Sequence, residues 1–336
     1  MDFLGLIVNY PVTRLLNEQE RAHHLQQKQR LGVEPHYQLS VIKMNSTYLE
    51  SVDKWFAWKG MISALAIILL VIFAGTLGLI SLRWLLEAAG DSSEDSGFLL
   101  ANGLGMAFVF ACLALVLIWL LRKESFAYTH YPMRFNRKTR MVHVFRPNGT
   151  VLSMPWDQLY FTLGHMAQWN DWEVRGHVLD ADQATVRESF ALSYVGSLNP
   201  GDEHDFVRAH WEFVRRYMED GPQSVSGQVQ FCMPIDVRRE TFKVGMERVF
   251  ANIASAPFLL YYLLFPLCLV VSLFRFIAVN TSKIPQWPAE VEAASAITPG
   301  EPYAMEGDTA GERVAVFPEA ASAAGVAFSV PHRAAR

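Results

Sequence analysis

The segment Met61–Leu82 reads MISALAIILLVIFAGTLGLISL, and Phe98–Leu121 reads FLLANGLGMAFVFACLALVLIWLL. Neither segment contains a charged residue, and each is about as long as a helix must be to cross a bilayer core of roughly 30 Å. Such runs predict two transmembrane helices joined by the short loop between them. We therefore expect a transmembrane hairpin at residues 55–123.

The charges around this hairpin predict its orientation. The connecting loop is acidic, whereas both flanks of the hairpin are basic. By the positive-inside rule, the flanks are cytoplasmic and the loop is external. We expect a multi-pass protein of the bacterial inner membrane, with a cytoplasmic N-terminal segment at residues 1–54. The acidic residues are Glu87, Asp91, Glu94 and Asp95, and the basic ones are Lys54, Lys59, Arg122 and Lys123.

The composition fits a membrane protein that carries one soluble domain. Of the 336 residues, 51% are hydrophobic, yet the mean hydropathy is only +0.14. This leaves room for a few spans and a domain of roughly 100 to 150 residues. The net charge of −4 argues against a general nucleic-acid binder, and the three cysteines cannot form a disulfide framework.

Two elements are expected before the hairpin. A helical pattern runs from about Val12 to Leu31, and Tyr37–Lys43 alternates partly, as a strand does. His23 and His24 are neighbours on the expected helix and point apart, so they do not predict a metal site.

After the hairpin, long apolar runs give way to short alternating ones, which predict an antiparallel meander within residues 124–222. Pro147-Asn148-Gly149 supplies the Asn-Gly pair that favours a tight hairpin turn. An apolar stripe from Phe206 to Met218 then predicts a closing helix that ends at Gly221-Pro222. The expected strands lie around Met133–Phe135, Arg140–Phe145, Thr150–Met154, Asp157–Leu163, Trp172–Leu179 and Thr185–Tyr194.

Two membrane helices, about six antiparallel strands and one closing helix resemble the bacterial pleckstrin-homology-like (PH-like) membrane proteins. The resemblance implies an α+β fold in which a small sheet or barrel, capped by a helix, hangs beneath the hairpin. That fold normally has seven strands, so either one more strand lies unrecognised in this region or it comes from elsewhere, such as Tyr37–Lys43. A fold of this class does not settle function.

The segment beyond residue 222 divides into three parts. Residues 223–249 include a basic amphipathic stretch and are expected to form a linker helix. Residues 250–279 are expected to form a third apolar helix that spans the membrane or, as the alternative, is re-entrant or interfacial. The basic residues before it favour a cytoplasmic start and an external tail. Residues 280–336 are rich in Ala, Pro, Gly and Glu and are expected to be disordered.

Several strings across residues 40 to 280 resemble an uncharacterised family of proteobacterial inner-membrane proteins that are often encoded near type VI secretion effectors. The resemblance carries no catalytic residues, and it implies a setting in the delivery of toxins between bacteria. The strings are IKMNSTYLESVDKW (Ile42–Trp55), YPMRFNRKTRMVHVF (Tyr131–Phe145), MPWDQ (Met154–Gln158), RGHVLD (Arg175–Asp180) and FVRRYMEDGP (Phe213–Pro222).

No catalytic, cofactor-binding or metal-binding motif is present in the sequence. We therefore expect a protein that is not an enzyme and that has no cofactor. The expected spans also lack buried charges, which an ion pathway would require. A dispersed set could converge in space, but such a set is typical of ordinary surface and strand residues: His165, His177, His204 and His210, with Asp157 and Glu173.

Two roles are predicted. In the first, which the resemblance implies, the protein is an immunity protein that binds and neutralises a toxin. In the second, it is a membrane-anchored scaffold or adaptor whose PH-like domain binds a secretion-system partner or anionic lipid. Cations near a charged membrane surface contribute about 1 kcal/mol each. The candidate lipid or partner contacts are Arg122, Lys123, Arg134, Arg137, Lys138, Arg140, Trp169 and Trp172.

Overall fold

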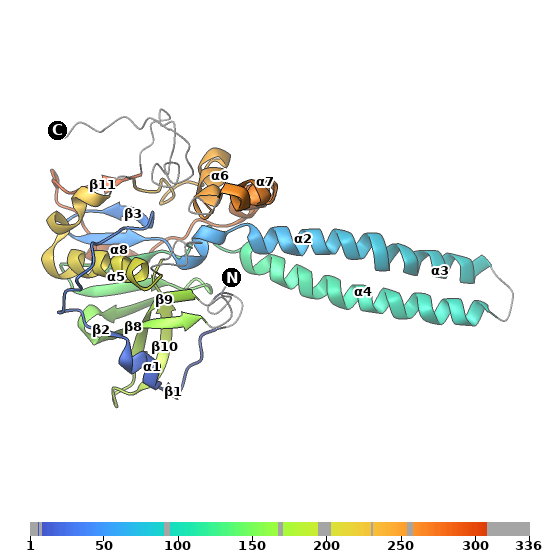
Figure 1. Cartoon of the computed structure of the whole chain (residues 1–336), viewed down its shortest axis with the longest axis horizontal. Helices are drawn as coiled ribbons and strands as arrows, with labels where there is room; N and C mark the ends of the chain where they lie inside the picture. Colours follow the sequence, from blue (N-terminus) through green and yellow to red (C-terminus); the bar gives the residue numbers. More distant parts are fainter. Residues whose placement is uncertain are drawn as a thin grey trace.

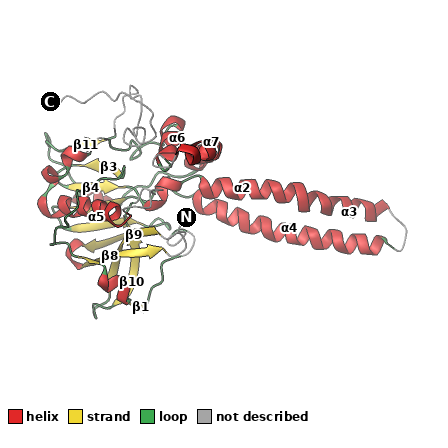
Figure 2. Cartoon of the chain, viewed as in Figure 1, coloured by secondary structure: helices red, strands yellow, loops and turns green. Residues whose placement is uncertain are grey.

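A computed structural model describes residues 6, 9–90, 95–166, 171–193, 203–229, 231–253 and 258–307. Within them the protein is α+β, as expected: two antiparallel sheets form a domain from which a long helical hairpin projects (Figure 1). Helices cover the sheets on one side and gather where the hairpin begins (Figure 2).

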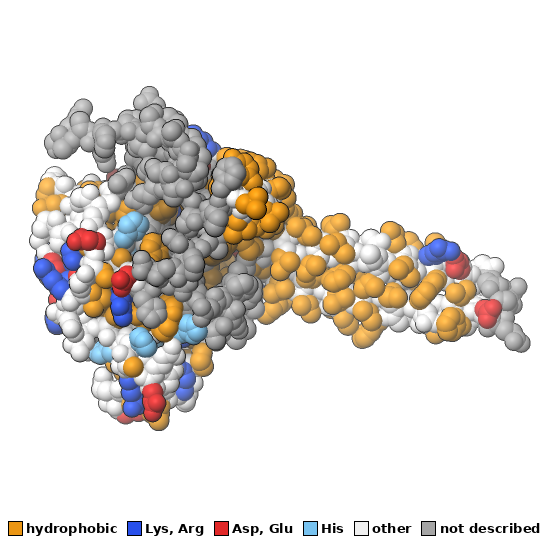
Figure 3. Space-filling model, viewed as in Figure 1, with side chains coloured by type: hydrophobic (Ala, Val, Ile, Leu, Met, Phe, Trp, Pro, Cys, Tyr) orange, Lys and Arg blue, Asp and Glu red, His pale blue; other side chains and the backbone are white. Residues whose placement is uncertain are grey.

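The hairpin has two straight arms. In the first, α2 (Met61–Phe73) continues through a π-helical turn (Ala74–Gly78) into α3 (Leu79–Gly90). The second arm, α4 (Ser96–Glu124), packs along both helices of the first. On the face that Figure 3 shows, apolar side chains are spread along the whole described length of the hairpin. Both arms are long and apolar enough to cross a membrane, and so is Leu259–Thr281 of a later helix.

The sheets are antiparallel throughout. One has the order β1-β10-β9-β8-β2 and the other β11-β3-β4-β5-β6-β7. The six strands expected after the hairpin are present as β5 to β10, with shifts of a few residues at their ends. The strands are β1 (Arg14–Leu15), β2 (His24–Leu25), β3 (Val41–Met44), β4 (Tyr48–Ser51), β5 (Met133–Asn136), β6 (Met141–Phe145), β7 (Val151–Pro155), β8 (Leu159–Met166), β9 (Asp171–Leu179), β10 (Thr185–Ala191) and β11 (Met305–Glu306).

The expected helix at Val12–Leu31 is wrong. In its place are β1, a short helix α1 (Glu18–Ala22) and β2. Asn17 and Glu20 form a reciprocal capping box that starts α1, while β1 pairs with β10 and β2 with β8, so that β1 and β2 are the two edge strands of one sheet. Edge pairing satisfies backbone groups that a surface helix would satisfy internally. The segment before the hairpin is therefore part of the two-sheet domain.

The closing helix α5 (Glu203–Asp220) confirms the prediction from its apolar stripe. Trp211 is fully buried, stacks on Trp156 with ring centroids 5.6 Å apart, and lies 4.7 Å from the ring of Phe161. Aromatic pairs at these distances contribute beyond their buried area. The main hydrophobic core thus lies between the sheets and α5.

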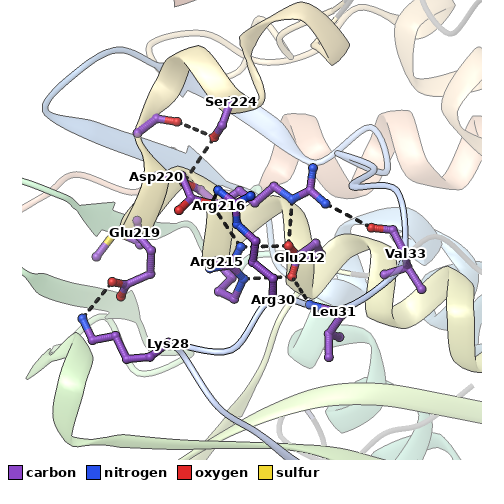
Figure 4. Close-up of polar contacts among 12 residues, drawn as sticks. Lys28, Arg30, Leu31, Val33, Glu212, Arg215, Arg216, Glu219, Asp220 and Ser224 are labelled. Carbon is purple, nitrogen blue, oxygen red and sulfur yellow. Dashed lines mark hydrogen bonds and ion pairs between the residues drawn. The ribbon is translucent and has the colours of Figure 1, made fainter.

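The last turns of α5 also bind the chain that links β2 to β3 (Figure 4). Buried Glu212 accepts hydrogen bonds from Arg215, from Arg216 and from the backbone N–H of Leu31. Lys28 forms an ion pair of 2.8 Å with Glu219. These contacts hold α5 against the segment between β2 and β3, which lies about 180 residues earlier in the chain.

Two expectations for the segment after residue 222 are wrong. The α-helix expected over residues 223–249 is confined to α6 (Phe242–Ala251). The chain before α6 forms two short 3-10 turns, Pro222–Ser224 and Ser226–Gln228, and Met233 then donates its backbone N–H to the carbonyl of Val41. The described part of the expected disordered tail is folded, since β11 pairs with β3 and Trp287 packs on Phe145. The remaining helices are α7 (Phe258–Thr281) and α8 (Ala289–Ala294).

Candidate ligand-binding cavity at the base of the hairpin

A cavity of about 920 Å³ lies where the hairpin meets the two sheets. Its walls come from the end of α4, the turn between β6 and β7, strand β10 and the segment before β1. Volumes near this value are typical of sites for small ligands. The cavity therefore joins segments that lie far apart in the sequence.

One wall of the cavity is the apolar surface of the hairpin. Leu115 and Ile118 line it from α4 and are both exposed, at 67% and 44%. Trp119 follows in the same helix. Tyr131 and Phe145 are buried and line the opposite side. The apolar wall is thus continuous with the outer surface of a helix that is apolar enough to cross a membrane.

The cations of the cavity differ in how they are paired. Lys123 lies over the ring of Trp119, 5.3 Å from its centroid. Arg146 binds Glu188 through two contacts of 2.6 Å each. Arg122 is exposed and has no hydrogen-bonding or ion-pair partner in the described part of the chain. The end of α4 therefore presents two positive charges that form no ion pair with a carboxylate of the described residues.

One of the residues that line the cavity is a buried carboxylate, Asp53. Asp53 accepts hydrogen bonds from the backbone N–H groups of Tyr131 at 2.7 Å, Trp55 at 3.0 Å and Phe56 at 3.1 Å. Burial raises the pKa of this carboxyl above its ordinary value, although these hydrogen bonds oppose the shift. Asp53 caps the short 3-10 helix at Lys54–Trp58 and fixes the path of the chain into the hairpin.

A second buried group of charges lies behind Tyr10, which lines the cavity. Glu173 is fully buried, with Lys54 and Arg175 each 2.5 Å from its carboxylate. Burial opposes the ionisation of Glu173, but these two cations outweigh it and hold the pKa of the carboxyl below its ordinary value. Tyr10 donates to the same carboxylate at 3.3 Å.

The hairpin itself is anchored by a buried lysine. Lys59 donates to the carbonyl oxygens of Glu124 at 3.0 Å and Tyr128 at 2.8 Å. Burial lowers the pKa of this ammonium group. The carboxylate of Glu124 accepts from the N–H of Ser63 at 2.7 Å, so that the first turn of α2 is tied to the last turn of α4.

The structure separates the predicted contact residues into several places. Only Arg122 and Lys123 line the cavity. Arg134 is buried between Glu50 at 2.7 Å and Glu292 at 3.1 Å. The remaining cations belong to the turn between β5 and β6, at the ends of these strands opposite the hairpin, where Arg140 pairs with Asp157 and Glu219. The other members of that turn are Arg137 and Lys138.

The two predicted tryptophans and the predicted chemical residues lie elsewhere. Trp172 packs against His23 and His165, with ring centroids 5.2 and 4.8 Å away, and Trp169 lies outside the described residues. No group of three or more His, Cys, Asp or Glu side chains that could hold a metal occurs among the described residues. Buried His177 contacts Ser189 and Glu20, buried His210 lies 3.4 Å from the carbonyl of His36, and the side chain of His204 is not described.

Several residues that line the cavity could not be identified from the sequence. Tyr10, Arg146 and Glu188 come from three segments in which no local pattern marks a binding residue. Trp119 could have been identified from the sequence, because an aromatic residue close to two cations at the end of an apolar helix is typical of a membrane interface.

A family model described as "Family of unknown function (DUF6708)" matches residues 110–299, which is more than half of the chain. The match begins within α4 and covers β5 to β10 and the helices α5 to α8. Its description names neither a secretion system nor a bacterial group. No curated protein and no solved structure matches the chain. The protein belongs to the DUF6708 family.

Proposed function

We propose that this protein is a membrane-anchored scaffold that holds an anionic phospholipid in the cavity at the base of its hairpin. The observation that carries the proposal is the position of Arg122 and Lys123. These two cations, which pair with no carboxylate in the part of the chain that the structure describes, border a cavity whose wall continues the apolar surface of α4. A phospholipid has the matching chemistry, an anionic headgroup joined to apolar chains.

Insertion of the hairpin is the first part of the proposal. Its outward apolar side chains include Val71 at 66%, Phe108 at 70% and Leu115 at 67% exposure, far more apolar surface than a soluble protein leaves in water. A bilayer covers such a surface. The acidic loop and the basic flanks favour a cytoplasmic two-sheet domain at the bacterial inner membrane.

Recognition of the headgroup is the second part. With the hairpin inserted, the end of α4 lies at the level of the lipid headgroups, where Trp119 and the neighbouring cations are favoured. Arg122 and Lys123 then bind the phosphate, while acyl chains follow Leu115 and Ile118. Each cation contributes about 1 kcal/mol near an anionic surface.

A PH-like assignment of the domain also belongs to this proposal. Strands β4 to β7 form four neighbours of one sheet, β8 to β10 form three neighbours of the other, and α5 follows. Four strands, three strands and a closing helix support the assignment. Strand β4 precedes the hairpin, so the hairpin interrupts the strand order between β4 and β5.

The test uses the full chain, purified from membranes and placed in nanodiscs of phosphatidylglycerol or phosphatidylcholine, with bound lipid identified by mass spectrometry. The double variant Arg122→Gln/Lys123→Gln is expected to lose about 2 kcal/mol of preference for the anionic lipid, roughly 30-fold. The control Arg137→Gln/Lys138→Gln removes the same charge from the turn between β5 and β6 and is expected to keep the preference. Equal losses in both variants, or no preference in the parent chain, would overturn lipid recognition.

Neutralisation of a toxin remains a prediction that rests on the sequence resemblance alone. It is tested by deleting the gene and measuring survival under attack by sibling cells. Unchanged survival would remove this role and leave the scaffold proposal untouched. Recovery of secretion-machinery proteins by crosslinking, without a toxin, would favour an adaptor.

A further inference from the structure

The third apolar helix, α7, is tied to the two-sheet domain at its C-terminal end. Lys283 donates its backbone N–H to the carbonyl of Ala127, and Thr129 donates to the carbonyl of Lys283. Arg239, in the segment that leads into α6, donates to the carbonyl oxygens of Val279 and Ser282 at 3.2 and 2.9 Å. The chain thus leaves the domain at α6 and returns to it at the end of α7.

The middle and the end of α7 lie beside α6. The rings of Phe250 and Phe265 lie 5.2 Å apart, and those of Phe242 and Phe276 lie 5.8 Å apart. The two helices are therefore antiparallel neighbours. At the turn between them, Asn252 donates to the carbonyl of Ala57 at the base of the hairpin. Both ends of the α6–α7 pair lie at this base.

α7 crosses the hairpin instead of running along it. Its contact with the hairpin involves the start of α2, where Arg275 lies against Gly60 and donates to the carbonyl of Phe56 at 2.6 Å. The apolar cluster between the two helices contains Ala64 with Cys268 and Val271. In Figure 1 the hairpin runs across the view, whereas α7 is seen nearly end-on.

Charges on α6 oppose a transmembrane position of α7. Lys243 is 57% exposed and lies 4.0 Å from Glu247, on a helix that packs beside the middle and the end of α7. A spanning α7 would carry these side chains into the hydrocarbon, where charged groups are costly. In the headgroup layer the same side chains remain hydrated.

The outer face of α7 is nevertheless strongly apolar. Leu259, Leu263 and Leu273 are exposed at 81%, 73% and 51%. A helix of 24 residues is about 36 Å long, so this face is too large to be left in water. Its position beside the hairpin base offers one apolar partner, the surface of the bilayer that the hairpin enters.

We infer that α7 lies in the plane of the membrane, with its exposed apolar face in the leaflet next to the two-sheet domain. This inference rests on the proposed insertion of the hairpin. The chain then crosses the bilayer twice, and residues 282–307 stay on the same side as the sheets. The α6–α7 pair acts as a second membrane contact that sets the distance of the domain from the bilayer.

The sidedness test introduces one cysteine at a time into a Cys112→Ala background, in which the two remaining cysteines, Cys232 and Cys268, are buried. The variants are labelled in native membranes with an impermeant maleimide from each side. Asp95→Cys reports the hairpin loop, Lys138→Cys the domain and Glu290→Cys the segment after α7. We expect Glu290→Cys to be labelled from the same side of the membrane as Lys138→Cys, and from the side opposite to Asp95→Cys. If Glu290→Cys and Asp95→Cys were labelled from the same side, the in-plane position of α7 would be wrong, but insertion of the hairpin would stand. Labelling of Lys138→Cys and Asp95→Cys from one side would instead overturn hairpin insertion.

A depth measurement provides the second readout. Leu259 and Leu273 lie on the same face of α7, four helical turns or about 21 Å apart along its axis. Nitroxide labels at these two positions are expected to give equal accessibility to a lipid-soluble quencher. A spanning α7 would place one label many ångströms deeper than the other, and that gradient would contradict an in-plane helix.

Discussion

Gly60 at the start of α2 lies directly against the backbone of Arg275 in α7. A Cβ atom on Gly60 would be 2.4 Å from the backbone nitrogen of Arg275, and Gly60 has a φ of +97°. The guanidinium of Arg275 is buried, pairs with Glu240 and donates to the hairpin base. This close crossing couples the hairpin, α6 and α7 to one another.

The variant Gly60→Ala is expected to lower the free energy of unfolding by about 2 to 5 kcal/mol, because both the positive φ and the backbone clash oppose a side chain. Thermal unfolding of the full chain in detergent measures the change. Gly105→Ala is the matched control, since nothing lies within 4 Å of its added Cβ and alanine favours a helix. Equal stability of the two variants would contradict the close crossing.

Trp287→Ala is expected to loosen the segment after α7. The ring of Trp287 packs edge-on against Phe145, with centroids 6.0 Å apart, and lies 4.9 Å from the guanidinium of Arg134. Loss of these contacts from a half-buried ring should cost roughly 2 kcal/mol. Hydrogen exchange at residues 282–307 should accelerate. Trp119→Ala, in the exposed wall of the cavity, should leave exchange in this segment unchanged.

His210 predicts a loss of stability in acid. Burial lowers the pKa of this imidazole to about 4, so the folded protein holds it neutral. Its contribution is complete above pH 6.5, the ordinary value, and declines as the pH falls toward 4, since the unfolded chain binds the proton first. The full decline amounts to roughly 3 kcal/mol. Unfolding curves between pH 7 and 4 should show this slope in the parent chain and a reduced slope in His210→Gln.

Glu173→Gln leaves Lys54 and Arg175 buried without their carboxylate and is expected to cost about 3 to 5 kcal/mol at pH 7. Because the pKa of Glu173 is below its ordinary value of 4.5, its stabilisation is complete above pH 4.5 and disappears as the pH falls further. The difference between parent and variant should therefore shrink in acid. Glu188→Gln is the control: its pair with Arg146 is partly exposed and should contribute less than about 1 kcal/mol.

Local sequence patterns were sufficient to predict those helices and strands whose formation depends mainly on their own residues. The hairpin follows from two uncharged runs, because a helix in an apolar phase satisfies its backbone internally and needs no partner. Strands β5 to β10 follow from alternation and turn residues, and α5 from its apolar stripe. These elements were predicted within a few residues of their observed ends.

Long-range pairing decided the rest. The two-residue strands β1 and β2 are too short to alternate, and they exist because each completes the edge of a sheet. The composition of residues 280–336 predicts disorder, yet in their described part β11 pairs with a sheet edge and Trp287 packs on Phe145. The sequence does not distinguish a hydrated arginine such as Arg122 from a buried one such as Arg134. It therefore could not show which of the predicted contact residues are available to a ligand.

The sequence by itself determined the apolar hairpin, the alternating strands and the closing helix, because each is written in the spacing of neighbouring residues. Only the tertiary structure decided the cavity, the buried charges and the crossing of α7 over α2. These features arise from residues that are distant along the chain, and their energies depend on desolvation and contact, which no local pattern encodes.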